Sequence, residues 1–259
     1  FVFAQPLLIQ NVTIIDGTGS NIQPIRSVLV EDGHIVKISE VGKFEIPNNT
    51  IIIDATDQFL IPGLWDMHTH WKDEPYLPLF IVNGITGVRD MGGVDKQYQW
   101  REQERTENYI GPKIILGTPL VDGSPPSWPN SIIVNNEEEA REVVNEYFDK
   151  GADFIKVYEN LSREAYFAIA DESKKLGITF AGHVPGRVSN AEASDAGQKS
   201  IEHLDDFGIA TSDVYTKIVA GYADKEMNDD TYLEFQERLF AGHRGEKQTE
   251  LFDKFVSNG

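Results

Sequence analysis

The sequence predicts an α/β fold: an incomplete (β/α)8 barrel of about six strand–helix units, preceded by a small β-domain. The chain has 259 residues, enough for one such barrel but not for a full barrel and a substantial second domain. Short strands and turns fill residues 1–60, and strands alternate with helices from Ile61-Pro62-Gly63 onward, as in a parallel sheet. We therefore expect a β-part over residues 1–60 and a barrel domain over 61–259, with a helical segment over 210–259.

Four strands are expected in the first part, where apolar and β-branched residues cluster between turn residues. These strands are Leu7–Ile15, Ser27–Val30, His34–Ile38 and Ile51–Asp54. The tetrapeptide Glu31-Asp32-Gly33-His34 lies between two of them, and Asp-Gly supplies the positive φ angles of a tight hairpin turn. The pattern predicts an antiparallel hairpin here.

Six strands are expected in the second part, each rich in apolar residues and separated from the next by a helical or loop pattern. They are Leu64–His70, Ile85–Asp90, Lys113–Gly117, Ala152–Tyr158, Ile178–His183 and Ser200–Leu204. Because all of them belong to βα units, their C-terminal ends should meet at one face of the barrel. That face is where barrel enzymes collect their catalytic residues.

The helices of the second part carry capping signals at their ends. Capping boxes are expected at Asn136 with Glu139, before a helix over 137–150, and at Ser189 with Glu192. Ser162 should begin a further helix that Gly177 ends. The last helix carries an apolar stripe made of Leu251, Phe252, Phe255 and Val256.

Composition excludes several classes of partner. The 42 acidic and 23 basic residues give a net charge of −19, which repels nucleic acids and anionic lipid surfaces. The chain has no cysteine, so disulfides, thiolate nucleophiles and cysteine-bound zinc are excluded. No apolar run approaches the ~18–20 residues of a membrane span. The apolar start at residues 1–5 is shorter than an export signal, and both a periplasmic and a cytoplasmic location stay open.

Histidines lie at the ends of three expected strands. His68 and His70 are two residues apart, so the period of a strand aims both imidazoles to the same side. His183 and His203 end the fifth and sixth expected strands. A lone His-x-His pair is weak evidence for a metal, but four histidines at strand ends of one barrel favour a shared site. The remaining histidines, His34 and His243, are interpreted as surface residues.

A lysine is buried in the fourth expected strand. Lys156 lies between apolar neighbours in Phe154-Ile155-Lys156-Val157-Tyr158, on a strand that should be covered on both faces. One explanation is a core salt bridge, or a side chain that extends to water at the barrel end. The other is an amine with a depressed pKa that forms a carbamate and bridges two cations.

These motifs resemble the amidohydrolase superfamily of metal-dependent hydrolases, in particular its imidazolonepropionase-like and Xaa-Pro dipeptidase-like branch. The resembling stretches are residues 61–70, 154–158, 181–186 and 201–203. The resemblance implies a metal-dependent hydrolase TIM barrel with a small β-sandwich beside it, and a centre of two divalent metal ions, usually zinc. It implies that His68 and His70 hold the first ion, that a carbamate on Lys156 bridges, and that His183 and His203 hold the second.

One element of the family pattern has no counterpart in this sequence. The family places an aspartate at the end of the eighth barrel strand, where it binds a cation and relays a proton, and the sequence ends before that strand. We therefore expect a C-terminal truncation, with the open barrel closed by a missing segment or by another subunit in a homo-oligomer. Little or no hydrolytic activity is expected of these 259 residues alone.

The predicted function is hydrolysis of an amide or peptide bond by a metal-bridging hydroxide, in a dipeptide, a prolyl dipeptide or an N-acyl amino acid. Tyr158 is the candidate to stabilise the oxyanion, or else a packing residue at the barrel rim. Arg89 is a candidate to bind a substrate carboxylate, or else forms an ion pair in the surroundings of Asp90. Trp128, in the loop 117–129, is a candidate substrate contact, or else packs on the rim. The alternatives are a phosphotriesterase or lactonase, and an inactive scaffold.

Overall fold

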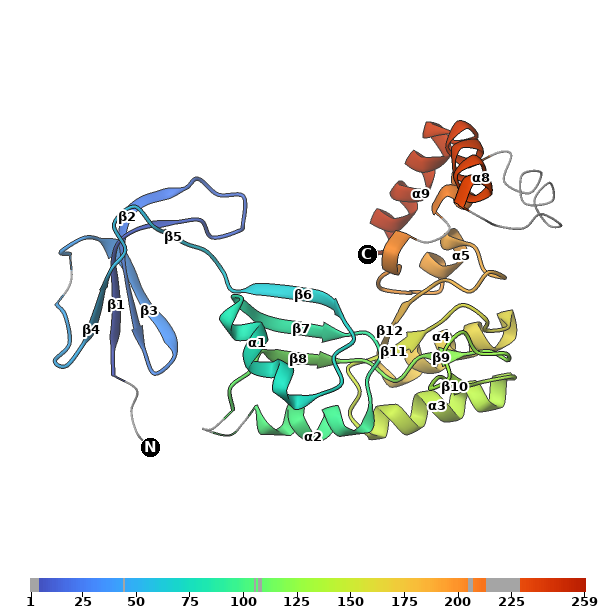
Figure 1. Cartoon of the computed structure of the whole chain (residues 1–259), viewed down its shortest axis with the longest axis horizontal. Helices are drawn as coiled ribbons and strands as arrows, with labels where there is room; N and C mark the ends of the chain where they lie inside the picture. Colours follow the sequence, from blue (N-terminus) through green and yellow to red (C-terminus); the bar gives the residue numbers. More distant parts are fainter. Residues whose placement is uncertain (1–4, 44, 105, 107–108, 205–206, 213–228) are drawn as a thin grey trace. The chain divides into compact units, whose positions relative to one another are not determined.

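The computed structural model describes residues 5–43, 45–104, 106, 109–204, 207–212 and 229–259. The chain divides into two compact units, Phe1–Leu64 and Trp65–Gly259. Each unit is described by itself below. Figure 1 labels their helices and strands.

The first unit is a five-stranded sheet with the order β3-β2-β1-β4, in which β5 also pairs with β1. The strands are β1 (Leu7–Ile14), β2 (Gln23–Glu31), β3 (His34–Glu40), β4 (Ile51–Asp54) and β5 (Phe59–Leu60). The four expected strands are confirmed, and β5 is an addition. The expected sandwich is not seen: the described residues of this unit form a single sheet.

The expected hairpin joins β2 to β3, which pair antiparallel. Asp32 and Gly33 have φ angles of 47° and 76°, the left-handed geometry that a two-residue primed turn requires. The core of this unit is small and consists of the buried side chains Val12, Ile14, Val28 and Ala55.

Parallel strands form the centre of the second unit. One group has the order β6 (Leu64–Thr69), β7 (Ile85–Asp90), β8 (Lys113–Leu116), and its arrows point the same way in Figure 1. The other has the order β10 (Ile132–Ile133), β9 (Val121–Asp122), β11 (Phe154–Val157), β12 (Thr179–Gly182). A parallel bridge between Gly117 and Phe154 connects β8 to β11. Five of the six expected strands are therefore confirmed.

The prediction of a sixth strand over Ser200–Leu204 is wrong. Ile201 makes one parallel bridge to Gly182, and a 3₁₀ turn η2 (Glu202–Leu204) follows at once. His203 and Leu204 have φ angles of 60° and 55°, which a strand does not allow. Among the described residues no strand pairs with the open edge of β6, so the strands do not close into a barrel.

Three helices of this unit, α3 (Glu137–Asp149), α4 (Arg163–Leu176) and α5 (Asn190–Asp195), begin at the predicted caps. The other described helices are η1 (Glu74–Tyr76), α1 (Leu77–Val82), α2 (Asp95–Gln103), α6 (Phe207–Ala210), α8 (Asp229–Ala241) and α9 (Gly245–Asn258). Ser162 caps α4, and Ser189 with Glu192 forms a complete capping box on α5. At α3 only half of the expected box exists, because the Glu139 carboxylate accepts from the backbone N–H of Asn135 instead of Asn136.

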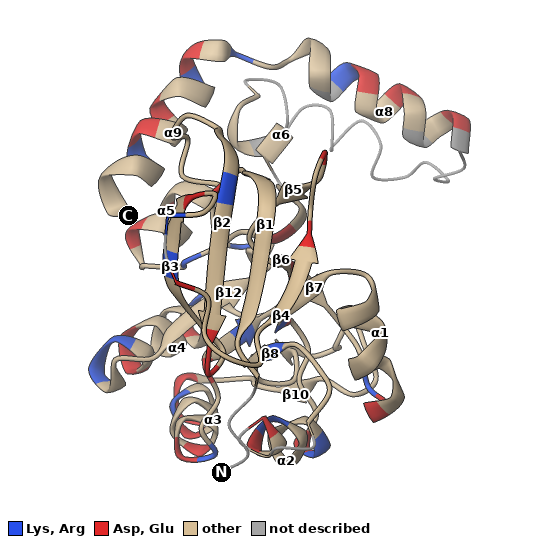
Figure 2. Ribbon diagram, turned by 90° about the vertical axis from the view of Figure 1, so that its left-hand side faces the viewer, with Lys and Arg blue, Asp and Glu red and all other residues tan. Residues whose placement is uncertain are grey.

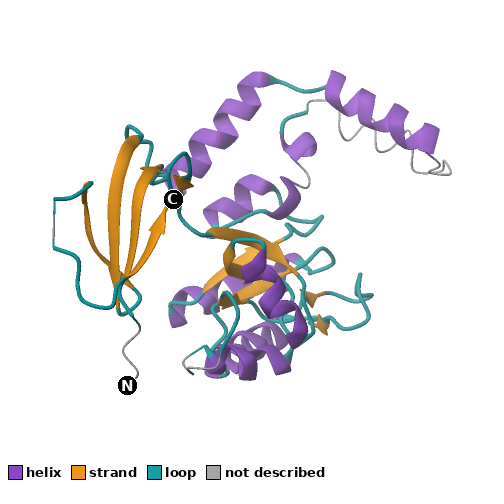
Figure 3. Cartoon of the chain, turned by 60° about the vertical axis from the view of Figure 1, so that its left-hand side comes forward, coloured by secondary structure: helices purple, strands orange, loops and turns teal. Residues whose placement is uncertain are grey.

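The main core lies between strands β9, β11 and β12 and helices α3 and α4. Figure 3 shows helices beside the strands of this unit. Ile155, Val157 and Ile169 are fully buried there. Tyr166 is also buried and donates its hydroxyl to the Gln198 amide oxygen at 2.6 Å. Charged residues are concentrated on the helices (Figure 2). None of the described helices combines the length and the apolarity needed to cross a bilayer.

The expected helical segment 210–259 is described only in part, since residues 213–228 lie outside the described residues. Its last helix, α9, buries Leu251 and stacks Phe252 on Phe207 with ring centroids 5.5 Å apart. Val256, the last residue of the expected apolar stripe, is 82% exposed. Lys254 of the same helix forms an ion pair with Asp195 of α5 at 2.7 Å.

Candidate metal and active site

The predicted site residues lie at the C-terminal ends of the parallel strands. His68 is in β6 and His70 follows it. Lys156 is in β11 and Tyr158 follows that strand. His183 follows β12, and His203 lies in η2. Parallel pairing of Lys156 with Ala181 sets the register that brings the ends of β11 and β12 together.

The four imidazoles form one row. The Nε2 atoms of His68 and His70 are 3.0 Å apart. The ring centroid of His203 is 4.5 Å from that of His68 and 5.1 Å from that of His183. The ends of β6 and β12 and the turn η2, which are far apart in the sequence, therefore place all four predicted histidine ligands in one cluster.

Lys156 and Tyr158 continue this row. The Tyr158 ring stacks on the His183 ring with centroids 4.3 Å apart, and Lys156 Nζ lies 5.7 Å from the centre of the Tyr158 ring. Lys156 is 0% exposed, which rules out the interpretation that its side chain extends to water. Gly182 makes room for it: a Cβ there would lie 3.1 Å from Lys156 Cδ and 2.1 Å from the Val157 carbonyl oxygen.

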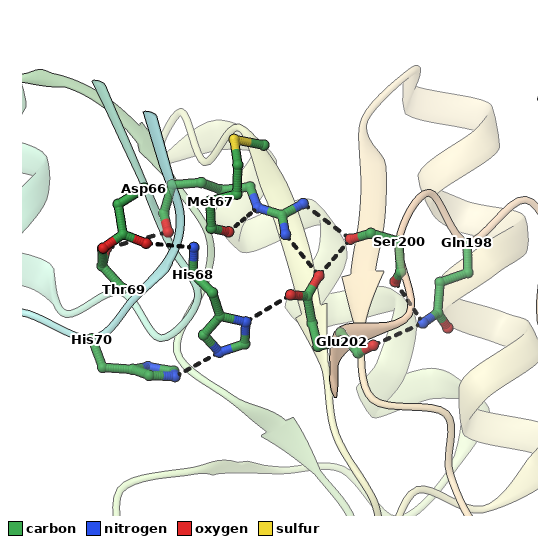
Figure 4. A network of polar contacts seen from close by, with 10 residues as sticks. Asp66, Met67, His68, Thr69, His70, Gln198, Ser200 and Glu202 are labelled. Atoms are coloured by element: carbon green, nitrogen blue, oxygen red, sulfur yellow. Dashed lines mark hydrogen bonds and ion pairs between the residues drawn. The ribbon is translucent and has the colours of Figure 1, made fainter. Parts of the chain in front are cut away.

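A carboxylate outside the predicted site residues anchors His68. Glu202 is 7% exposed, and its Oε2 lies 2.6 Å from His68 Nδ1. Its Oε1 accepts from Arg89 at 2.8 Å and from the Ser200 hydroxyl at 2.6 Å (Figure 4). Strand alternation would have turned Glu202 away from the side chain of His203. The left-handed backbone of His203 breaks that alternation, so no periodic signal could have found Glu202.

The charges of this network follow from burial and hydrogen bonding. Burial lowers the pKa of His70 to about 4, and the charges of His68 and Lys156 add to the effect. Burial also lowers the pKa of His68, although Glu202 acts against it. For Glu202, burial raises the pKa, but hydrogen bonds from Ser200 and His68 outweigh it and hold the pKa below its usual range. At neutral pH both imidazoles are therefore neutral and Glu202 is ionised.

The predicted substrate contacts are engaged within the protein. Arg89 donates from Nε to the Met67 carbonyl at 2.7 Å, in addition to its contacts with Ser200 and Glu202. Trp128 is 58% exposed and donates its indole N–H to the Tyr158 hydroxyl at 2.9 Å. Arg89 thus forms an internal ion pair, and its partner is the distant Glu202. The roles of Arg89, Trp128 and Tyr158 toward a substrate stay predictions.

Two buried aspartates that are not among the predicted site residues support the surrounding loops. Asp122 Oδ1 accepts from the backbone N–H groups of Gly123 and Asn160, at 2.9 and 2.7 Å. Asp90 accepts from the Gly92 backbone at 3.0 Å, and burial raises the pKa of this carboxyl to about 6. Both directly end strands, which is the one signal that marks them in the sequence.

The two histidines assigned to the surface differ. His34 is exposed in the hairpin, as expected. His243 is half-buried, and the surface assignment is wrong. Its Nδ1 lies 2.9 Å from the Thr211 hydroxyl and its Nε2 lies 2.9 Å from the Gln248 amide oxygen. Two polar side chains far apart in the sequence thus hold this ring between α6 and α9.

The facing pair His68 and His70 fits one cation. Zinc binds histidine nitrogens at about 2.0–2.1 Å, so two ligands of a tetrahedral site lie about 3.3 Å apart. The observed Nε2 to Nε2 distance of 3.0 Å is close to that value, and neutral imidazoles are the ligand form. In the part of the chain that the structure describes, no three His, Asp or Glu side chains are already arranged as a metal cluster. The complete binuclear centre therefore stays a proposal.

Comparisons with known proteins agree with one another on the class of protein that this chain resembles. No protein-family model matches the chain. A dihydroorotase of Carboxydothermus hydrogenoformans is 30% identical over 117 residues, 39% of this chain and 26% of that protein. The structure of a bottromycin amidohydrolase is 25% identical with a TM-score of 0.66, covering 83% of this chain and 46% of that one. A Bifidobacterium longum protein described as a prolidase is 22% identical with a TM-score of 0.68, covering 93% and 69%.

The sequence match and the structural match are both to members of the amidohydrolase superfamily, which confirms that the motifs of this chain resemble that superfamily. The chain spans about a quarter of the dihydroorotase and less than half of the bottromycin amidohydrolase. The activity and substrates of the whole protein are therefore matters for proposal.

Proposed function

We propose that this chain carries the metal site of a hydrolase that cleaves an amide or peptide bond. One observation carries the proposal: four imidazoles and a fully buried lysine, from segments far apart in the sequence, form one cluster near the C-terminal ends of β6, β11 and β12. The named relatives, a dihydroorotase, a bottromycin amidohydrolase and a prolidase, support hydrolysis as the reaction class. The substrate class that we propose is a dipeptide, a prolyl dipeptide or an N-acyl amino acid.

Five residues would hold two divalent cations, with zinc the first candidate. His68 and His70 would bind one ion and His183 and His203 the other. Lys156 would bridge as a carbamate, formed when its amine nitrogen bonds to the carbon of carbon dioxide and loses a proton. Bound cations of this kind lower the pKa of a water molecule and polarise the carbonyl oxygen that it attacks.

Other residues of the chain would orient the substrate. Tyr158 accepts a hydrogen bond from Trp128 at 2.9 Å, and we assign its own O–H to the developing oxyanion. The exposed face of the Trp128 indole would contact an apolar or prolyl side chain of the substrate. Arg89 would attract a substrate carboxylate by its positive charge, while its hydrogen bonds to Glu202 and Ser200 hold the guanidinium in place.

The domain assignment belongs to the same proposal. Residues 61–259 would be the hydrolase domain, and residues 1–60 would form the β-part of a composite domain. The open edge of β6 would be covered by a further segment or by another subunit. Either arrangement is compatible with a small-molecule substrate.

Metal content and turnover test this proposal together. The chain would be loaded with zinc, manganese or cobalt, desalted and measured by inductively coupled plasma mass spectrometry. Bound metal would then be compared in wild type, His68→Ala and His70→Ala. Substrates would include Xaa-Pro dipeptides, N-acyl amino acids, dihydroorotate, lactones and organophosphates. We expect the wild type to bind stoichiometric metal and either substitution to abolish this binding. Turnover of amides is expected once the β6 edge is covered.

The other outcomes separate the alternatives. Turnover of lactones or organophosphates alone would replace the proposal by the lactonase or phosphotriesterase assignment. Metal binding without any turnover, with the β6 edge covered, would favour a scaffold. Wild-type protein that retains no more metal than the two variants would contradict the metal site itself.

A further inference from the structure

Both carboxylate oxygens of Glu202 accept hydrogen bonds, and one of them is constrained by Arg89. Oε1 accepts from Arg89 at 2.8 Å and from the Ser200 hydroxyl at 2.6 Å, and Oε2 faces His68 Nδ1 at 2.6 Å. A guanidinium group can only donate. Arg89 is itself oriented by donating to the carbonyl oxygen of Met67, the residue before His68. These contacts therefore fix the orientation of the carboxylate, with Oε2 of Glu202 directed at His68 Nδ1.

We propose that Glu202 is a positioning residue that selects the tautomer of His68 with hydrogen on Nδ1, and so keeps the Nε2 lone pair directed at His70. An ionised carboxylate only accepts, so the nitrogen that faces it carries the hydrogen. A second assignment follows for His70. The two Nε2 atoms are 3.0 Å apart, a hydrogen-bond distance, so in the metal-free chain His70 carries hydrogen on Nε2 and donates it to His68.

The consequence for metal binding rests on the proposed function, whereas the tautomers do not. With its Nδ1 hydrogen held by Glu202, His68 presents Nε2 as a ready ligand. Carboxylates that fix a metal-binding histidine in this way are worth about 10–100-fold in metal affinity. Glu202, Arg89 and Ser200 would therefore tune the site without touching the metal.

The substitution Glu202→Gln tests the inference sharply, because it keeps the shape and changes one donor. Arg89 can only donate hydrogen bonds, so the new amide should direct its oxygen at Arg89 and the Ser200 hydroxyl. The amide NH₂ group then faces His68 Nδ1 and donates to it. His68 is expected to switch to the tautomer with hydrogen on Nε2, and the affinity for zinc should fall about 10–100-fold.

Two measurements on the full 259-residue chain give the answer. Two-bond ¹H–¹⁵N correlation spectra of ¹⁵N-histidine-labelled, metal-free protein show which ring nitrogen carries hydrogen, and His68→Gln and His70→Gln variants assign the signals. Zinc affinity is measured by competition with a chromophoric chelator. The matched control is Glu159→Gln, because Glu159 faces a different imidazole and lies 2.9 Å from Nδ1 of His183; this substitution should leave the His68 tautomer unchanged.

The outcomes are separable. Wild-type His68 with hydrogen on Nε2, or a Glu202→Gln variant that keeps hydrogen on Nδ1, would overturn the inference. An unchanged zinc affinity despite a switched tautomer would overturn the positioning role. If Glu202→Gln does not fold, the wild-type spectrum decides alone. If the tautomers are as proposed and zinc does not bind, the proposed function fails and the tautomer assignment stands.

Discussion

Replacing Arg89 with methionine should destabilise the second unit, because the substitution leaves the Glu202 carboxylate buried without its cation. Side-chain exposure is 16% for Arg89 and 7% for Glu202, so solvent screens this pair only weakly. Removing one partner of a buried ion pair typically costs about 3–5 kcal/mol. Because Ser200 and His68 still donate to Glu202, we expect the loss to be about 2–3 kcal/mol.

A double-mutant cycle isolates the buried charge. In the Glu202→Gln background no charge is left unpaired, so Arg89→Met should cost only about 1 kcal/mol, the value of ordinary hydrogen bonds. The expected coupling between the two positions is therefore about 1–2 kcal/mol. Urea unfolding followed by tryptophan fluorescence reports this unit alone, since all four tryptophans lie within residues 65–128. If the two losses add to within about 0.5 kcal/mol, the ion pair contributes nothing and the reasoning is refuted.

Three further predictions concern neighbouring groups. Burial raises the pKa of Asp90 to about 6, so this carboxyl keeps its proton to a higher pH in the folded state than in the unfolded state. The free energy of unfolding should therefore fall as the pH rises from about 4 to about 6. The Asp90→Asn variant should lose that part of the pH dependence of urea unfolding, about 2 kcal/mol, and an unchanged profile would contradict the shift. Tyr166→Phe leaves the buried Gln198 amide without its donor and should lower the free energy of unfolding by about 1–3 kcal/mol, whereas a neutral effect would show that Gln198 finds another partner. Gly92→Ala would place a Cβ 2.8 Å from His70 Nδ1, so the imidazole must shift and zinc affinity should fall with little loss of stability; unaltered affinity would show that His70 is not a ligand.

Much of the local structure is determined by the sequence alone. The caps at Ser162 and Ser189, and the turn at Asp32-Gly33, depend on hydrogen bonds and backbone preferences that span two to four residues. The strands β6 to β8 and β11 to β12 follow from apolar runs between breakers. The histidines and Lys156 could be placed at strand ends for the same reason, and parallel strands bring such ends together.

Other features were decided by contacts between residues far apart in the chain. The expected sixth strand became a 3₁₀ turn, because after one bridge at Ile201 the chain turns so that Glu202 meets His68 and Arg89. His243 was assigned to the surface, yet Thr211 and Gln248 hold it half-buried.

The physical reason is the range of the forces. Caps and turns are stabilised within a few residues, so their partners are visible in a short stretch of sequence. The pairing of Glu202 with His68 joins positions 134 residues apart and exists only because packing places the two strand ends together. Burial then favours the neutral form of both imidazoles, whereas hydrogen bonds from Ser200 and His68 keep Glu202 ionised against the effect of burial. The ligand types of the candidate site could thus be predicted from the sequence, whereas the carboxylate that orients one of them was determined by tertiary structure.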